Sequence, residues 1–225
     1  MASTSEKGRR GGRPRSLTQE MIIDAALDVV DREGLDALTI RGLAQVLGVG
    51  QMTIYGYVRT KDEIVDLLGV RVLGELGGAE QGDGPWQQRL GDAFRRIRVT
   101  MLRHPAVGAY LLSAHATHGP QLDQVRDSLI AVMLDAGFSP QRAVDGIAVL
   151  TSYVIGFVEA ESVRARRHPD EEDLSHLRHL DQVRYPHLTS VWDTWIQRTS
   201  ARTFEVGLGL LIDGLARDPR GEGSG

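Results

Sequence analysis

Residues 38–64 read LTIRGLAQVLGVGQMTIYGYVRTKDEI, and this stretch decides how the N-terminal part of the chain folds. Two short helical patterns follow one another, the first beginning after Thr39 and the second covering about 51–57, with Gly48 between them. Two steeply crossed helices need a small residue at their contact, which Ala44 supplies, and a turn residue that tolerates unusual backbone angles, which Gly48 supplies. Ile54 can anchor the second helix in the core. The spacing predicts a helix-turn-helix at Ile40–Val58.

The charge around this motif favours contact with a polyanion. The whole chain has a net charge of −4, yet the segment Ala37–Lys61 contains Arg41, Arg59 and Lys61 and no Asp or Glu. A surface without carboxylates suits a DNA backbone, because each carboxylate would repel the phosphates. Chance in a short window is the other explanation. Together with the motif, the pattern indicates DNA binding.

Working outward, the remaining periodicity is helical throughout, which predicts an all-α fold. The stripe Ile22, Ile23, Ala26, Leu27, Val29 and Val30 predicts a helix from about Thr18 to Glu33. Thr60 and Glu63 form a capping-box pattern that opens a helix to about Leu76. Further helices are expected at about 86–103, 106–116, 120–136, 140–166 and 200–217, with less regular structure at 169–199. We expect a flexible basic arm at 1–16 and a DNA-binding domain at 17–68, whose last helix continues as a connector. A larger helical domain for ligand binding and dimerisation is expected at 77–217, followed by a disordered tail at 218–225.

The composition excludes several classes of function. The chain has no cysteine, so it has no disulfide, thiolate nucleophile or Cys-ligated zinc. We find no H-E-x-x-H, no G-x-S-x-G and no phosphate-binding glycine loop, and we expect neither an enzyme nor a cofactor. No apolar run approaches about 20 residues, and the N-terminus is rich in Gly and Arg. We therefore expect a cytoplasmic protein without a membrane partner.

The motif residues also carry a family resemblance. L-A-x-x-L-G-V at 43–49, T-I-Y-x-Y-V at 53–58 and T-K-D-E at 60–63 resemble the DNA-binding domain of tetracycline-repressor-type (TetR) regulators. The match is close over about 17–68. Y-P-H-L at 185–188 and F-E-V-G-L-G-L-L-I-D-G-L at 204–215 are similar, more loosely, to the ligand-binding half of regulators near the tetracycline repressors.

The resemblance and the residue chemistry together suggest which side chains contact DNA. Gln51 and Thr53, at the exposed start of the second motif helix, are expected to read base edges, and Met52 can contact a thymine methyl group. Gly56 stands where relatives often carry a large side chain, so one contact is missing there. Phosphate contacts, which set the register, are expected from Thr39, Arg41, Tyr55, Tyr57 and Lys61. Alternatively, the two tyrosines pack beneath the next helix.

Two further patterns are less specific. G-G-R-P-R at 11–15 resembles an AT-hook core, in which Arg13 and Arg15 would enter the minor groove; a solubilising tail is equally compatible. His115 with His118, and His176 with His179 and Asp173, have spacings that can place metal ligands on one helix face. The second group lies in a strongly polar stretch typical of a solvated face, and we predict no metal site.

The C-terminal half presents seams of small and large apolar residues that let helices approach closely. They suggest a dimer interface, with an ordinary intrachain core as the alternative, and comprise Gly146, Tyr153, Gly156, Phe157, Phe204, Gly207, Leu208, Leu211 and Gly214. A ligand pocket is expected among Met101, Tyr110, His115, Met133, Tyr153 and Trp192. The resemblance implies a homodimer joined by its last long helices, and a small-molecule inducer that shifts the helix following Thr60.

We therefore predict a DNA-binding transcriptional regulator, in its most concrete form a repressor that a small-molecule effector releases from a palindromic double-stranded DNA operator. Two other functions stay open. One is an architectural DNA-binding protein that binds no effector. The other is a helical-bundle enzyme with a structural helix-turn-helix, which would need converging ionisable residues that the sequence does not offer.

Overall fold

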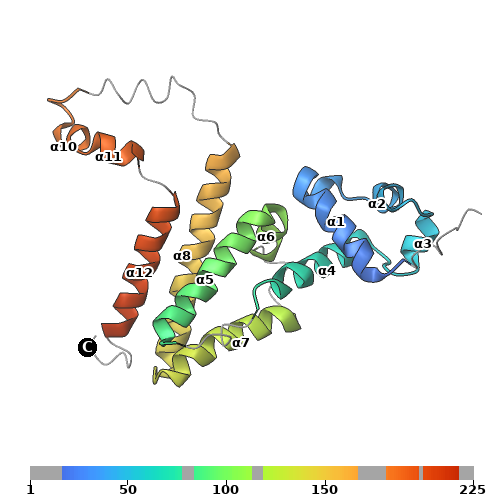
Figure 1. The fold of residues 1–225 in the computed structure, drawn as a ribbon, viewed down its shortest axis with the longest axis horizontal. Coiled ribbons are helices and arrows are strands. Elements are labelled where there is room, and N and C mark those ends of the chain that lie inside the picture. The colour runs from blue at the N-terminus through green and yellow to red at the C-terminus, as the bar shows by residue number, and fades with distance from the viewer. Residues whose placement is uncertain (1–16, 78–83, 113–118, 167–180, 198–199, 218–225) are drawn as a thin grey trace, which may run out of the picture. The chain divides into compact units, whose positions relative to one another are not determined.

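The computed structural model describes residues 17–77, 84–112, 119–166, 181–197 and 200–217, and every regular element in these ranges is a helix (Figure 1). The predicted all-α fold is confirmed. The chain divides into two compact units, Met1–Ile64 and Val65–Gly225. The basic arm with Arg13 and Arg15, and the tail at 218–225, lie outside the described residues.

The first helix of the N-terminal unit, α1 (Gln19–Glu33), follows its sequence pattern closely. The hydroxyl oxygen of Thr18 accepts a hydrogen bond from the backbone N–H of Met21 at 3.3 Å, and Gly34 ends the helix at a φ of 86°. All six residues of the predicted stripe are buried. A single 3₁₀ turn, η1 (Leu35–Ala37), then leads to α2.

Helices α2 (Ile40–Leu47) and α3 (Gln51–Tyr55) form the expected helix-turn-helix. Gly48 adopts a left-handed conformation with φ 67° and ψ 29°, which a residue with a Cβ adopts only with strain. Ala44 is buried at the start of the turn, and its carbonyl accepts the N–H of Val49 at 3.0 Å. The turn therefore depends on the small residue and the glycine identified in the sequence.

Helix α3 ends two residues before its expected end at Tyr57, because its last turn tightens. The N–H of Gly56 donates to the Thr53 carbonyl at 3.2 Å, and that of Tyr57 donates to the Ile54 carbonyl at 2.9 Å. A Cβ on Gly56 would lie 3.2 Å from the Thr53 carbonyl oxygen. Glycine at position 56 thus avoids a close contact in this tight turn.

Helix α4 (Lys61–Gly74) begins at a cap that differs in one detail from the predicted box. The Thr60 hydroxyl oxygen accepts the N–H of Glu63 at 3.1 Å, as expected. The Glu63 carboxylate, however, accepts the N–H of Arg59 at 2.6 Å, one residue before the cap. The helix begins in the N-terminal unit and continues into the second unit from Val65.

The second unit contains α5 (Trp86–Arg103), α6 (Pro105–Leu112), α7 (Pro120–Asp135), α8 (Pro140–Arg166), α10 (Pro186–Ser190), α11 (Trp192–Gln197) and α12 (Ser200–Arg217). Helices α10 and α11 lie in the segment that was expected to be less regular. Helix α8 packs against α5, α7 and α12, and α5 also packs against α12 (Figure 1). These four helices form the core of the unit.

The centre of this core is an aromatic cluster joined to an ion pair. The fully buried Phe204 ring stacks on Tyr153 at a centroid distance of 5.7 Å and meets the edge of Phe157 at 5.4 Å. The Arg98 guanidinium lies 4.7 Å from the Phe204 ring centroid and binds both carboxylate oxygens of Glu161, at 2.7 and 2.8 Å. Both charges are well shielded from water, so their pairing holds α5 against α8.

One expectation needs correction. Helix α8 contains a segment, Pro140–Arg164, that is long and apolar enough to cross a membrane by length and composition, although the sequence had suggested no such run. The apolar character has a local cause, because Leu150 and Val154 face the core of the second unit and other α8 residues line a cavity. The partly buried Glu161 pairs with Arg98 on α5. We therefore assign α8 to the core of this helical unit.

Candidate DNA-binding and ligand-binding sites

Helix α3 presents the residues that were expected to read bases. Ile54 is its only buried residue and anchors it to the N-terminal unit. Gln51, Met52 and Thr53 are exposed, and Met52 is 80% exposed, which is unusual for so apolar a side chain. The first turn of α3 thus offers an amide, a thioether and a hydroxyl to a partner, a combination suited to base edges and thymine methyl groups.

Three of the predicted phosphate contacts lie near the starts of α2 and α4. The Thr39 hydroxyl oxygen accepts the N–H of Gly42 at 3.0 Å, and this cap leaves its own O–H available as a donor. Arg41 is exposed in the first turn of α2, and Lys61 is partly exposed at the first residue of α4. Cations and donors near helix N-termini are suitable ligands for phosphate oxygens.

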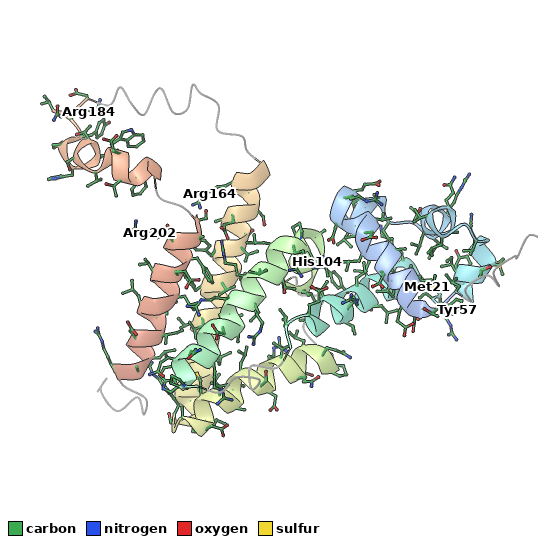
Figure 2. The ribbon with its side chains drawn as sticks, viewed as in Figure 1. Met21, Tyr57, His104, Arg164, Arg184 and Arg202 are labelled. Atoms are coloured by element: carbon green, nitrogen blue, oxygen red, sulfur yellow. The ribbon has the colours of Figure 1, made fainter. Side chains whose placement is uncertain are left out.

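The two tyrosines differ from one another. Tyr55 is 45% exposed on α3 and can contribute its ring and hydroxyl to a partner. The Tyr57 hydroxyl donates to the backbone carbonyl of Leu17 at 2.6 Å, and the side chain lies at the edge of the unit (Figure 2). This bond ties the residue preceding the α1 cap to the end of α3. Tyr57 therefore has a structural role in the chain without DNA, and its phosphate contact stays a prediction.

The second unit contains a partly open cavity of about 500 Å³. Its wall is made by the end of α4 with Leu73 and Leu76, by α5, by Leu111 of α6, and by one face each of α7 and α8. Among the described lining residues, only Arg126, Thr151 and Ser152 are polar. A cavity of this size with a mostly apolar wall and few polar groups is typical of a small-molecule site.

The sequence located this cavity only in part. Of the residues predicted to line it, Met101 does so, whereas Met133 is fully buried in the core and Tyr153 donates its hydroxyl to the Phe204 carbonyl at 3.0 Å. Tyr110 instead hydrogen-bonds Asp66 of α4. Trp192 of α11 is not in the wall, and His115 lies outside the described residues. Of the aromatic side chains that had suggested the pocket, Tyr153 packs against the core, whereas Tyr110 and Trp192 belong neither to the core nor to the cavity wall.

Most of the lining residues that were not predicted have smaller side chains than the aromatic ones and are regularly spaced along their helices. Leu122, Arg126 and Ile130 are spaced by four on α7, and Val144, Ala148 and Thr151 lie along α8. This helical spacing was visible in the sequence. Nothing in one sequence, however, distinguishes an apolar helix face that borders a cavity from one that borders the core.

Contacts at the end of α4 join it to the corner between α5 and α6. The Glu75 carboxylate lies 3.3 Å from the Arg71 guanidinium, 3.1 Å from that of Arg103 and 3.4 Å from Nε2 of the buried His104 (Figure 2). A Cβ on Gly69 would lie 3.1 Å from Cδ2 of Leu111, so α4 and α6 approach closely. Leu111 of the cavity wall therefore packs directly against α4.

Most residues of the predicted dimer seam join helices of one chain. Phe204 and Leu208 are fully buried, a Cβ on Gly207 would overlap the Tyr153 ring, and a Cβ on Gly146 would lie 3.0 Å from a Leu215 methyl. The close approach that small residues allow is thus used between α8 and α12. Phe157 and Leu211 pack partly buried against the same core, while Gly156 and Gly214 face open space. Large apolar residues exposed nearby are Val149 and Val163 of α8 and Val206 and Leu210 of α12.

No group of three or more potential metal ligands occurs within the described ranges. The histidine pairs noted in the sequence, His115 with His118 and His176 with His179, lie outside those ranges. The architecture consists of a helix-turn-helix unit followed by a helical unit with an apolar cavity. Together they define a ligand-responsive DNA-binding regulator.

Comparison with known proteins agrees with this class. Residues 22–68 match the family of bacterial regulatory proteins of the tetR family, and residues 78–218 match the tetracyclin repressor-like C-terminal domain. An HTH-type transcriptional regulator of Saccharopolyspora erythraea is 34% identical over 69% of this chain and 64% of its own length. The tetracycline repressor protein class A of Escherichia coli transposon 1721 is 28% identical over 89% of this chain and 91% of its own.

A solved relative covers nearly the whole chain. The TetR family protein ActR of Streptomyces coelicolor, in complex with actinorhodin, is 27% identical over 93% of this chain and all of its own, with a TM-score of 0.76. The chain belongs to the TetR family and is a ligand-responsive, DNA-binding transcriptional repressor. Regulators of this family are not enzymes, in agreement with the sequence prediction.

Proposed function

We propose that this repressor acts in the cytoplasm as a homodimer on a palindromic operator, and that a small molecule in the cavity of the second unit releases it. Gln51, Met52 and Thr53 read the bases of each half-site, while Thr39, Arg41, Tyr55 and Lys61 bind phosphates. One short recognition helix reads only a few base pairs, and two-fold symmetry doubles this number.

The proposed dimer interface is the exposed apolar face of α8 and α12. Val149, Val163, Val206 and Leu210 are between 44% and 68% exposed in the single chain. Gly156, Gly209 and Gly214 leave open space beside them, which allows a second pair of helices to approach closely. Burial of this face in a four-helix arrangement would remove large apolar side chains from water.

The observation that carries the effector proposal is the position of α4. Leu73 and Leu76 line the cavity at the end of this helix, and Lys61, a proposed phosphate ligand, begins it. An effector that packs against the two leucines acts on the same helix that leads into the DNA-binding unit. Such a ligand changes DNA affinity only if it prefers one position of α4 over the other. ActR, which has a similar fold, was solved in complex with actinorhodin, and this supports binding of a small molecule by the present chain.

Pinning α4 to α6 should abolish induction. The variant Gly69→Cys/Leu111→Cys places two cysteines where the helices approach closely, in a chain that has no other cysteine. The oxidised protein should bind operator normally and stay bound when effector is added, as measured by fluorescence anisotropy of labelled DNA. A suitable effector is any compound that raises the Tm of the wild-type chain and releases it from DNA.

The reduced double variant and each single cysteine variant are the matched controls, and they should remain inducible. Full release of the oxidised protein by effector would contradict α4 as the coupling element.

A further inference from the structure

Among the described residues that line the cavity, one side chain, Arg126, is charged. Arg126 lies in the middle of a row on α7, with Leu122 four residues before it and Ile130 four residues after it, and all three line the cavity. Side chains spaced by four lie along one helix face. Arg126 is thus flanked by apolar lining residues on its own helix face, and its side chain is about half-exposed.

The wall has no carboxylate among the described lining residues, and its other polar groups are the hydroxyls of Thr151 and Ser152 on α8. Asp123, one turn before Arg126, lies 3.4 Å from the guanidinium, a long distance for an ion pair, and both side chains are about half-exposed or more. Such a pair contributes little to stability. The guanidinium has five N–H donors, so it can bind an anionic group in the cavity while it keeps other contacts.

We propose that the effector is an apolar molecule that carries one anionic group, a carboxylate or a group of similar charge, and that Arg126 binds this group. This inference rests on the proposed function of the cavity. A guanidinium pairs with carboxylate-like anions through two parallel hydrogen bonds. Thr151 and Ser152 can orient polar atoms elsewhere on the ligand, while the other lining residues pack against its apolar body.

Two probes of nearly equal shape test the charge. 8-Anilinonaphthalene-1-sulfonate carries a sulfonate, and N-phenyl-1-naphthylamine is the same ring system without it. Binding of each is followed by fluorescence on the full chain. We expect Arg126→Gln to weaken binding of the sulfonate probe about tenfold, the loss of one charge-assisted interaction, and to change binding of the neutral probe less than about twofold. Arg126→Lys, which keeps the charge, should retain most of the sulfonate affinity.

Two controls locate the effect. Asp123→Asn removes the neighbouring carboxylate and should leave sulfonate binding unchanged or stronger, and Ala148→Trp fills the cavity and should remove binding of both probes. Equal loss of both probes in Arg126→Gln, or no loss of either, would overturn the proposal, as would failure of both to bind the wild-type chain. Operator binding by Arg126→Gln is measured separately and should be normal. If the wild-type chain shows no specific DNA binding, this result refutes the proposed function instead.

Discussion

Replacing Phe204 by alanine is expected to lower the free energy of unfolding by about 3–5 kcal/mol, the range for removing a fully buried phenylalanine side chain. The ring is completely buried and contacts Tyr153, Phe157 and the Arg98 guanidinium. Its loss leaves a void beside an ion pair whose charges are shielded from water. Urea denaturation followed by tryptophan fluorescence measures the effect, because Trp86, Trp192 and Trp195 all lie in the second unit.

The matched control is Val99→Ala on α5, where the valine side chain is 49% exposed. This variant should change the unfolding free energy by less than about 0.5 kcal/mol. The experiment also separates a core role of Phe204 from the interface role that the sequence suggested. A stable Phe204→Ala monomer that fails only to dimerise would contradict the core assignment.

Replacing Gln51 by alanine and Thr53 by valine together should lower the ratio of operator to random-DNA affinity about 100-fold or more. Each contact to a base edge contributes about 1–3 kcal/mol of discrimination, and about 1.4 kcal/mol is a factor of ten. Both side chains are exposed, so the fold should be unchanged, which far-ultraviolet circular dichroism can verify. Titrations of labelled operator and of random duplex at one salt concentration give the ratio.

Arg41→Ala is the contrasting variant, because a phosphate contact carries no sequence information. It should weaken binding of operator and of random DNA by similar factors. It should also reduce the slope of log affinity against log salt by about 1 for each phosphate that the protein no longer neutralises. If the ratio of operator to random-DNA affinity is unchanged in the Gln51/Thr53 double variant, these residues do not read the bases.

The N-terminal unit was predictable because its signals are local. The Thr18 and Thr39 caps, the left-handed turn at Gly48 and the buried stripe of α1 each depend on residues a few positions apart. The shortened end of α3 was not predicted, because the tight turn at Gly56 joins backbone groups that no side-chain periodicity marks. The bond from the Tyr57 hydroxyl to the Leu17 carbonyl joins residues distant in the sequence, so it was not predicted either.

In the second unit the sequence predicted the helices, but it did not predict what each apolar helix face packs against. Its long helices match their expected ranges closely, whereas the same apolar seam can face a partner chain, a neighbouring helix or a cavity. Gly207 was assigned to a dimer interface and instead makes room for Tyr153, and Arg126 was not singled out at all. Such choices depend on contacts between residues distant in sequence.

Selection of bound sequences from a random duplex library, using the full-length chain, tests the central claim most directly. We predict enrichment of a two-fold symmetric site whose half-sites are separated by about one helical turn or a multiple of it, as expected when a symmetric dimer presents α3 twice. The effector should reduce recovery of this site. Failure to enrich any sequence, or enrichment of a single half-site without a symmetric partner, would contradict the account.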